Sequence, residues 1–404
     1  MQKSSAAFRV NHLPPFLLGE LAASVIAART SGRDVIDLSQ LNPSLGPPGA
    51  AVEKLVQASL QPHNHKYSSS QGITKLRSSM CQWYERRFEV SLDPEREVVV
   101  TMGSKEGLSH LLFAVASPGD AVLLPSPAYP IHVASIALAG ANCIAVSLPD
   151  VQSNGGVLTE QSDELFERLT AAYEAAWPRP IMMVLSFPHN PTATVVTLGF
   201  FERLVGLARE KGFYLAHDFA YADVCFDGYR TPSILQARGA RDVAVEFCSL
   251  SKGMSMPGWR IGVCAGNEAL VSALKKIKSY LDCGAFQPLQ IAAIKAFDSY
   301  DQTIHEAVDI YRARRDVLAS GLAQLGFELN VPKGSLFLWA RIPEKFRGAG
   351  SFAFCRMLLE QANVAACPGS GFDSHADDYV RFALVEPEAR LRTAIAKLEQ
   401  VLKS

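Results

Sequence analysis

The chain has 404 residues, of which 48% are hydrophobic and 20% charged, and its formal net charge at pH 7 is −1. This length favours two domains with a large packed core, and a near-neutral charge without basic blocks argues against nucleic acid or an anionic membrane as partner. No apolar run is long enough to predict a membrane span, and the N-terminal residues do not resemble a secretory signal.

The eight cysteines and nine histidines are scattered along the chain. None of the cysteines forms a CxxC pair, so their spacing fits neither a metal site nor a disulfide framework. We therefore expect reduced and mostly buried thiols, no bound metal and a cytoplasmic location.

Seven short apolar runs in the first two thirds of the chain predict buried strands. They span residues 97–103, 120–125, 142–148, 181–187, 213–218, 243–249 and 260–266. Most are separated by segments with helical periodicity, such as 105–116 and 198–212. This alternation predicts an α/β fold with a mostly parallel seven-stranded sheet between helices. Ligands of such sheets bind beyond the carboxyl ends of the strands, and polar residues gather there at 103–105, 189–190, 218–221 and 249–252.

The pattern changes after about residue 296. A long helical segment at 307–326 leads into an apolar segment at 335–343, and a second apolar segment at 379–385 precedes a last helix at 388–402. We therefore predict a smaller α+β domain at the C-terminus. The predicted division is an N-terminal arm that packs on the small domain (1–45), a large domain that carries the ligand site (46–295) and the small domain (296–404).

The segment CSLSKGMSMPGWRIGV, residues 248–263, places Ser249, Ser251, Lys252 and Arg260 close together without any acidic residue. A lysine amine can form a Schiff base with an aldehyde, while an arginine and two hydroxyls can bind a phosphate. The cofactor that carries both groups is pyridoxal 5′-phosphate (PLP), an electron sink for carbanions. Taken alone, the segment is equally consistent with a solvated loop that has incidental serines.

Two further strand ends carry side chains that PLP would need. Asp218 ends an apolar run, where its carboxylate can pair with the pyridinium nitrogen, and Tyr221 follows three residues later. Asn190 follows another run and can donate to the O3′ atom of the cofactor. Taken alone, an aspartate at a strand end is also typical of helix caps and turns. An Asn-Pro pair, taken alone, is also typical of a plain turn.

Two more positions fit the same ligand. Gly103 and Ser104 stand at the start of a predicted helix, where backbone N–H groups and the helix dipole bind phosphate. Tyr129 follows a strand, where its aromatic ring can stack on the pyridine ring. Each has an ordinary alternative, which is a helix cap for the serine and a core position for the tyrosine.

Several motifs, in this order along the chain, resemble class I/II aminotransferases of fold type I. They are GSKEG at 103–107, NPTA at 190–193, HDFAYAD at 217–223, and SLSK at 249–252 followed eight residues later by Arg260. The chain is most similar to the bacterial-type alanine (glutamate–pyruvate) aminotransferases, and the resemblance covers nearly its whole length. It implies PLP-dependent transfer of an amino group between a small L-amino acid, such as alanine or glutamate, and a 2-oxo acid.

The resemblance also implies roles for individual residues. Lys252 would form an aldimine with PLP and then move the Cα proton by way of a quinonoid, while Asp218 pairs with the pyridinium nitrogen. Asn190 and Tyr221 would bond O3′, and Tyr129 would stack on the ring. Arg381 would grip the α-carboxylate of the substrate, next to Asn190, Tyr129 and Leu41. The phosphate would be held by Gly103, Ser104, Lys105, Ser249, Ser251 and Arg260. Tyr67 would reach the phosphate of the neighbouring subunit, which implies a homodimer with shared active sites.

Four residues on the substrate side depart from the family pattern. The family usually has a glycine where this chain has Leu41, preceded by Gln40, and a leucine side chain would narrow the pocket. Ala285 and Gln287 stand where relatives tend to carry small hydroxyl residues, close to the partner's phosphate. Tolerated drift is one explanation. The other is a changed substrate or reaction, namely PLP-dependent elimination, γ-replacement or cyclisation of S-adenosylmethionine or a larger amino acid.

Overall fold

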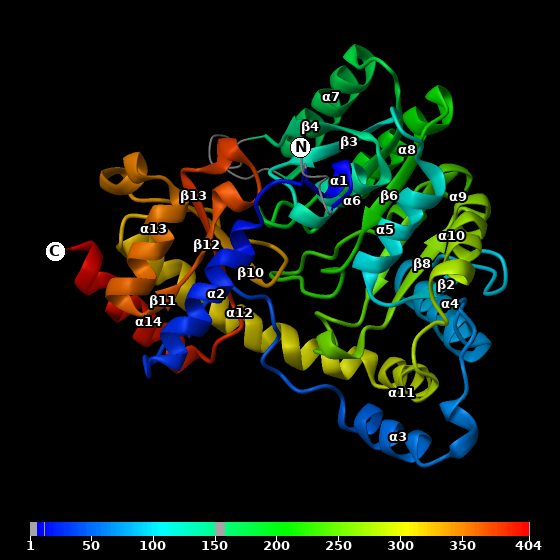
Figure 1. The fold of residues 1–404 in the computed structure, drawn as a ribbon, viewed down its shortest axis with the longest axis horizontal. Helices are drawn as coiled ribbons and strands as arrows, with labels where there is room; N and C mark the ends of the chain where they lie inside the picture. The colour runs from blue at the N-terminus through cyan, green and yellow to red at the C-terminus, as the bar shows by residue number, and fades with distance from the viewer. Residues whose placement is uncertain (1–5, 12, 150–157, 404) are drawn as a thin grey trace.

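The computed structural model describes residues 6–11, 13–149 and 158–403. Figure 1 shows a large body around one sheet and a smaller body that contains the C-terminus, with the long helix α12 running between them. None of the helices in the described ranges combines the length and the apolarity needed to cross a bilayer.

The helices are α1 (Phe8–Asn11), α2 (Leu17–Thr30), α3 (Gly49–Ser59), α4 (Thr74–Phe88), α5 (Ser104–Val115), α6 (Pro130–Ala139), α7 (Leu158–Ala175), α8 (Leu198–Lys211), α9 (Ala240–Val243), α10 (Glu268–Leu281), α11 (Gln287–Asp298), α12 (Tyr300–Gln324), α13 (Ser351–Met357) and α14 (Glu388–Leu402). The strands are β1 (Ile36–Asp37), β2 (Val98–Thr101), β3 (Ala121–Ser126), β4 (Asn142–Ser147), β5 (Pro180–Ser186), β6 (Tyr214–Asp218), β7 (Ala244–Ser249), β8 (Gly262–Gly266), β9 (Glu328–Leu329), β10 (Phe337–Arg341), β11 (Val364–Ala365), β12 (Cys367–Pro368) and β13 (Tyr379–Ala383).

The central sheet of the large body has seven strands in the order β2-β8-β7-β6-β5-β3-β4. Neighbouring strands are parallel, except that β8 runs antiparallel to both β2 and β7. Each predicted apolar run overlaps one of these strands, and the predicted mostly parallel seven-stranded sheet is confirmed.

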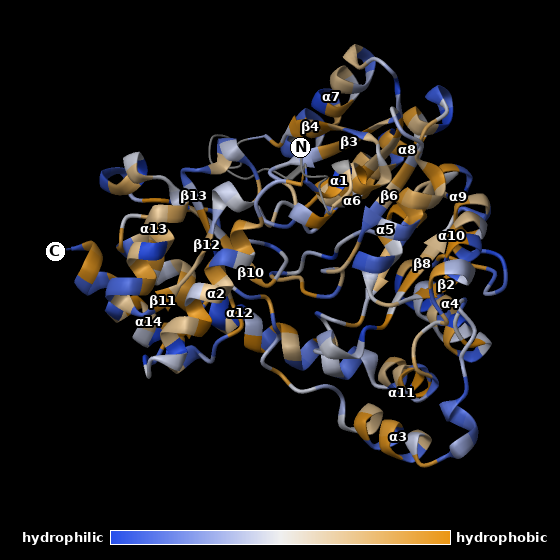
Figure 2. Ribbon diagram, in the orientation of Figure 1, coloured by the Kyte–Doolittle hydropathy of each residue, from blue (hydrophilic) through white to orange (hydrophobic). Residues whose placement is uncertain are grey.

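Helices cover both faces of this sheet because successive side chains of a strand point to opposite sides. In β5, Met183 and Leu185 pack in the core formed with α4, α7 and α8, whereas Met182 and Val184 pack in the core formed with α5, α6 and α10. Figure 2 shows the apolar colour on strands such as β3 and β6, between these helices. Burial on both faces therefore explains why the strands read as continuous apolar runs.

The smaller body is built on an antiparallel sheet, β12-β13-β10-β9, which packs with α12, α13 and α14. Helix α12 begins at Tyr300, whereas the sequence pattern predicted a start near residue 307. The first turns of α12 are mostly polar, but Tyr300 and Ile304 are buried in the core of the large body. This helix therefore belongs to the cores of both bodies.

The N-terminal segment packs on the smaller body. Strand β1 pairs in parallel with β11, with Ile36 opposite Val364, and Val25 of α2 packs with Leu359. In Figure 1, α2 lies beside β12. The limits 1–45, 46–295 and 296–404 for the three parts stay a prediction.

Candidate active site

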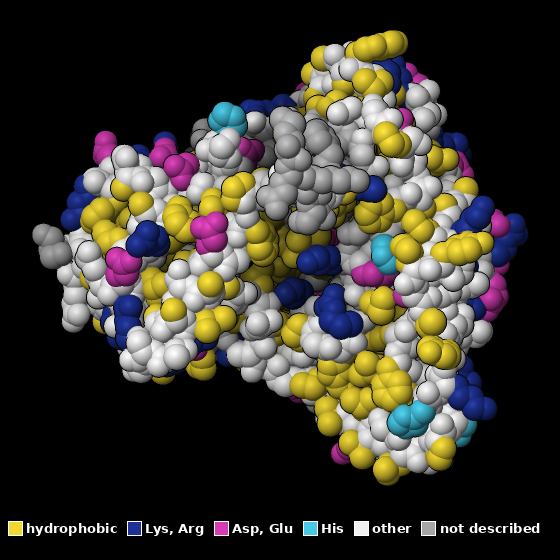
Figure 3. Space-filling model, viewed as in Figure 1, with side chains coloured by type: hydrophobic (Ala, Val, Ile, Leu, Met, Phe, Trp, Pro, Cys, Tyr) yellow, Lys and Arg dark blue, Asp and Glu magenta, His cyan; other side chains and the backbone are white. Residues whose placement is uncertain are grey.

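A cavity of about 680 Å³ opens beyond the carboxyl ends of the central strands and is lined by residues of both bodies. Figure 3 shows a hollow near the centre of this face in which Lys and Arg side chains gather. Most of the predicted site residues line this cavity, namely Gln40, Leu41, Ser104, Lys105, Tyr129, Asn190, Asp218, Tyr221, Ser249, Ser251, Lys252, Arg260 and Arg381.

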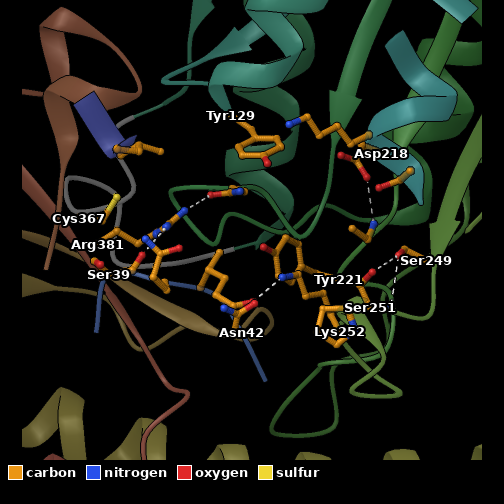
Figure 4. Close-up of a pocket in the computed structure, with 18 of the residues that line it drawn as sticks. Ser39, Asn42, Tyr129, Asp218, Tyr221, Ser249, Ser251, Lys252, Cys367 and Arg381 are labelled. Carbon is orange, nitrogen blue, oxygen red and sulfur yellow. Dashed lines mark hydrogen bonds between the residues drawn. The ribbon is translucent and has the colours of Figure 1, made fainter. Parts of the chain in front are cut away.

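The charges in the cavity favour anionic ligands. Among the described residues that line it, four are cations, Lys105, Lys252, Arg260 and Arg381, and Asp218 is the one carboxylate. In Figure 4, Arg381 and Ser39 lie on one side of the cavity, and Asp218, Ser249 and Ser251 lie on the other. A ligand that bridges the two sides can therefore carry a negative group at each end.

Lys252 lies in the turn that follows β7, and its ammonium is largely shielded from solvent. Its Nζ donates to the carbonyl oxygen of Leu41 over 2.6 Å. Burial lowers the pKa of Lys252 to about 8, and the positive charges of Arg381 and Arg260 add to this effect, whereas Asp218 opposes it. More of this side chain than of an ordinary lysine is therefore a neutral, nucleophilic amine near neutral pH, although the ammonium form still prevails at pH 7.

Arg260, Ser249 and Ser251 converge on the N-terminus of α5. The Arg260 guanidinium donates to the carbonyl oxygen of Met102 over 3.1 Å, next to Gly103. Gly103 has φ +80°, and a Cβ at this position would overlap the Arg260 guanidinium, so only glycine lets the arginine lie over this turn. The Ser249 hydroxyl donates to the Ser251 hydroxyl over 2.8 Å. Hydroxyls, a guanidinium and a helix N-terminus together form a cradle for a phosphate.

The start of α5 is anchored by a buried ion cluster. One carboxylate oxygen of Glu106 accepts the backbone N–H of Met102 over 2.8 Å, and the other accepts from Lys278 over 3.0 Å. The Lys278 side chain is fully buried and also donates to Asp282 over 2.9 Å. These bonds tie α5 to α10 and hold the turn that carries Gly103 and Ser104.

Asp218 ends β6 and projects into the cavity. The Nε2 atom of His132 lies 3.0 Å from its carboxylate, and the His132 ring meets the Tyr129 ring edge-on at 5.5 Å. His132 is one of the residues that sequence reasoning missed. Its position three residues after Tyr129 on α6 could have revealed it, because residues at this spacing share one helix face.

Arg381 stands on β13, where it is 4% exposed. Its Nη1 donates to the Asn190 side-chain oxygen over 2.7 Å, and its Nη2 donates to the Ser39 carbonyl oxygen over 3.2 Å. Phe337 and Phe372 lie 5.2 and 4.8 Å from the guanidinium. Its Nε is buried and has no hydrogen-bond partner within the described residues. An orphaned guanidinium N–H at a cavity wall fits an anionic ligand such as a carboxylate.

The comparisons with known proteins agree with this geometry. The model of the family "Aminotransferase class I and II" matches residues 33–398. The chain belongs to this family. It is 45% identical to the glutamate-pyruvate aminotransferase AlaC of Escherichia coli over 98% of this chain and 93% of the relative, and 37% identical to the LL-diaminopimelate aminotransferase of Moorella thermoacetica over 98% of each.

Solved structures are similar to this aminotransferase over nearly its whole length. Substrate-bound BacF from Bacillus subtilis has a TM-score of 0.91 at 31% identity and covers 99% of this chain and 98% of its own. A variant of the aspartate aminotransferase of Thermus thermophilus has a TM-score of 0.89 at 27% identity and covers 99% of this chain and 100% of its own. The fold is that of the fold type I enzymes, and the aminotransferase is PLP-dependent like its family.

The residues of the cavity fit PLP. The phosphate cradle, the amine of Lys252 and the carboxylate of Asp218 line one connected space. Arg381 stands on the opposite wall, and its buried Nε has no hydrogen-bond partner within the described residues. Burial raises the pKa of Tyr129 and of Tyr221, so both phenols stay protonated and can donate hydrogen bonds.

The aminotransferase also lines its cavity with residues that the sequence did not indicate. Helix α2 and the residues before it contribute an apolar wall, Phe16, Leu18, Leu21 and Ala22, and further lining residues include Ser39, Asn42, Ser186 and Cys367. No motif marks these positions, because the approach of the N-terminal segment to the cavity depends on its packing against the smaller body.

Four predicted positions are not among the lining residues of this cavity: Gly103, which lies behind the Arg260 guanidinium, and Tyr67, Ala285 and Gln287. Ala285 is buried, and the Gln287 side chain donates to Asn64 over 2.9 Å. Tyr67 is 92% exposed and lies three residues after Asn64, the residue that Gln287 contacts. The loop at 283–290 and the segment around Tyr67 therefore form one surface, away from the lining of the cavity in this subunit.

Proposed function

We propose that the enzyme transfers the amino group of alanine or glutamate to a 2-oxo acid. The main support is the composition of the cavity wall around Arg381. Residues 40–42 follow Ser39, whose carbonyl accepts from Arg381; among the residues that line the cavity, Leu21 and Leu41 offer an apolar surface to a small side chain, and Gln40 and Asn42 offer neutral donors to a second carboxylate. The similarity to a glutamate-pyruvate aminotransferase also supports this choice.

In this proposal, the chain holds its cofactor and its substrate at opposite ends of the cavity. Ser104, Lys105, Ser249, Ser251 and Arg260 would bind the phosphate of PLP, and Gly103 leaves room for the Arg260 guanidinium. Arg381 would bind the α-carboxylate through N–H groups that the protein leaves free. This two-point attachment fixes the orientation of the substrate Cα–H bond.

Lys252 would hold the cofactor through Nζ, and its amine would act as the base that moves the Cα proton of the substrate. Its low pKa suits a base that works near neutral pH. PLP, when bound, supplies an electron sink for the negative charge left at Cα. Asp218, oriented by His132, would keep the pyridine nitrogen protonated, and Asn190 and Tyr221 would bond O3′.

We further infer that two subunits pair through the surface that carries Tyr67. Exposed apolar side chains cluster there, including Val56, Leu60, Tyr67 and Phe286. The rings of His65 and Phe286 meet at 5.4 Å, which ties helix α3 and its following segment to α11. Figure 3 shows the hydrophobic colour over this region. A large exposed apolar patch is typical of an interface, from which Tyr67 would reach the partner's phosphate.

The eight cysteines, all of which are free thiols, support a reducing compartment such as the cytoplasm.

The substrate proposal is tested by measuring kcat/KM for alanine, glutamate, aspartate and LL-diaminopimelate, with pyruvate or 2-oxoglutarate as acceptor. We expect alanine and glutamate to lead. A preference for LL-diaminopimelate would overturn the substrate assignment, and release of ammonia or of a side-chain leaving group would favour elimination instead.

The dimer proposal is tested by mixing two inactive variants, Lys252→Ala and Tyr67→Ala. If active sites are shared, mixed dimers contain one site with both defects and one site with neither, so activity returns on subunit exchange. Failure to regain activity, although exchange is shown by mass spectrometry, would contradict the shared site.

A further inference from the structure

A second cleft, of about 830 Å³, lies in the large body and shares no lining residue with the active-site cavity. The end of α4, the start of α8, residues 223–236 and the first turns of α12 form its walls. Its volume is within the range of about 300–1,000 Å³ that is usual for small-molecule sites. The roles proposed above for catalysis do not use any of its residues.

The floor of this cleft is apolar and largely aromatic. Trp83, Phe88, Tyr300 and Ile304 all line it and are buried. The rings of Trp83 and Tyr300 meet edge-on at 5.6 Å, so the floor is well packed. A flat apolar or aromatic group is therefore the natural occupant of the deeper part.

Three arginines line the same cleft. Arg86 and Arg230 are exposed, and neither forms a side-chain hydrogen bond or an ion pair within residues 6–11, 13–149 and 158–403. Two carboxylates face them, Asp301 at the rim and the buried Asp223, which accepts a hydrogen bond from Tyr300. His305 is also exposed at the rim, 3.8 Å from the Asp309 carboxylate. The mouth of the cleft therefore has an excess of positive charge.

Arg87 connects the mouth to the floor. Its guanidinium lies 5.3 Å from the Phe88 ring and 5.7 Å from the Tyr300 ring, and Nη2 donates to the Ala222 carbonyl oxygen over 2.9 Å. The distance from Nη2 to the Asp223 carboxylate is 3.7 Å. The Nε of Arg87 is buried without a hydrogen-bond partner in the described part of the chain. A guanidinium that is held in place at the wall of the cleft is suited to bind a carboxylate.

We propose that this cleft is a second ligand site, which takes an aromatic carboxylate and modulates the active site. The carboxylate would be bound by Arg87 with Arg86 and Arg230, while the aromatic body lies on the rings of the floor. The positive charge of the three arginines favours an anionic ligand, and the aromatic floor favours a ligand with an aromatic ring system.

Asp223 gives this site a direct connection to Lys252. A Cβ on Gly253 would overlap the Asp223 carboxylate and would stand 2.7 Å from Ile304, so both side chains pack against the backbone that follows Lys252. A ligand carboxylate that competes for Arg87 weakens the hold of Arg87 on Asp223. We therefore expect occupancy of the cleft to change kcat and to leave the KM of the amino donor nearly unchanged.

The test is isothermal titration calorimetry of the PLP-loaded enzyme with 1-naphthoate and, as a neutral analogue, 1-naphthamide. Naphthoate should bind, and naphthamide should bind more weakly. The double variant Arg86→Gln/Arg230→Gln should raise the Kd of naphthoate roughly two- to thirtyfold, as expected for two exposed charges. Arg238→Gln, which removes an exposed arginine that does not line the cleft, should leave the Kd unchanged.

Three results would overturn the site: absence of binding at millimolar naphthoate, an unchanged Kd in the double variant, or inhibition that is purely competitive with the amino donor. The last would mean that naphthoate occupies the active site at Arg381. Binding without a change in kcat would overturn the connection to Lys252. Because calorimetry needs no substrate, a failure here is distinguishable from a failure of the alanine or glutamate assignment.

Discussion

Replacement of Arg381 by lysine would separate substrate binding from cofactor binding. Of the five N–H groups of this guanidinium, two bond Asn190 and the Ser39 carbonyl, and the others form no hydrogen bond within the described residues. A lysine has three donors, so if it keeps both protein bonds, one remains where the arginine offers a bidentate pair. The loss of one hydrogen bond to a charged group, worth about 1.5–3 kcal/mol, predicts a fall in kcat/KM of about 10- to 150-fold.

The assay is steady-state kinetics with alanine and 2-oxoglutarate, together with titration of the cofactor-free protein with PLP. Arg381→Lys should raise KM and leave the Kd of PLP nearly unchanged. Arg260→Lys is the matched control, since it should weaken PLP binding with a smaller effect on KM. The reasoning would be refuted if the two variants exchanged these effects, or if Arg381→Lys changed neither constant.

Three further predictions concern Lys252, Leu41 and His132. Because the pKa of Lys252 is lowered to about 8, its neutral amine forms as pH rises through 8. The rate of PLP loading, followed by absorbance, should therefore rise with pH and have its midpoint near pH 8. A midpoint above pH 10 would contradict the argument that burial lowers this pKa. Leu41→Gly should raise kcat/KM for norvaline relative to alanine by about tenfold or more, because the pocket gains room for longer side chains; an unchanged ratio would show that Leu41 does not limit size. His132→Phe removes the partner of Asp218. It should raise the Kd of PLP by about tenfold or more and leave the KM for alanine unchanged. An equal rise in the Kd of PLP and the KM for alanine would instead indicate general disorder of the site.

The sheet and the strand-end residues that line the cavity were predictable from sequence because their signals are local. Strands buried on both faces give continuous apolar runs, so the position of Asp218 at the end of β6 could be read directly. Ser249 ends β7 in the same way, and Ser251 and Lys252 follow it. The order of the strands in space brings these ends together.

The remainder of the cavity depends on contacts between distant segments. Phe16 and Leu21 line the cavity because the N-terminal segment packs on the smaller body, for which the sequence holds no motif. Strand β8 starts at Gly262, two residues later than predicted, because Arg260 adopts a left-handed conformation with φ +55°. This conformation costs free energy for any residue other than glycine. At Arg260 it places the guanidinium over Gly103.

The second cleft also could not be predicted from the sequence. Arg86, Arg87 and Arg230 belong to segments that are far apart in the chain, and helix α12 closes the cleft only because its first turns extend back to Tyr300. Surface arginines in such segments usually contact only solvent, so their convergence is visible only in the fold.

The central claim is that one amino group leaves the donor, stays on the enzyme and passes to the acceptor. It is tested most directly by mixing the PLP-loaded enzyme with ¹⁵N-alanine in the absence of any 2-oxo acid, and then adding 2-oxoglutarate. The account predicts one pyruvate per active site without free ammonia, followed by release of ¹⁵N-glutamate. Continuous formation of pyruvate together with ¹⁵N-ammonia, before any acceptor is added, would contradict it.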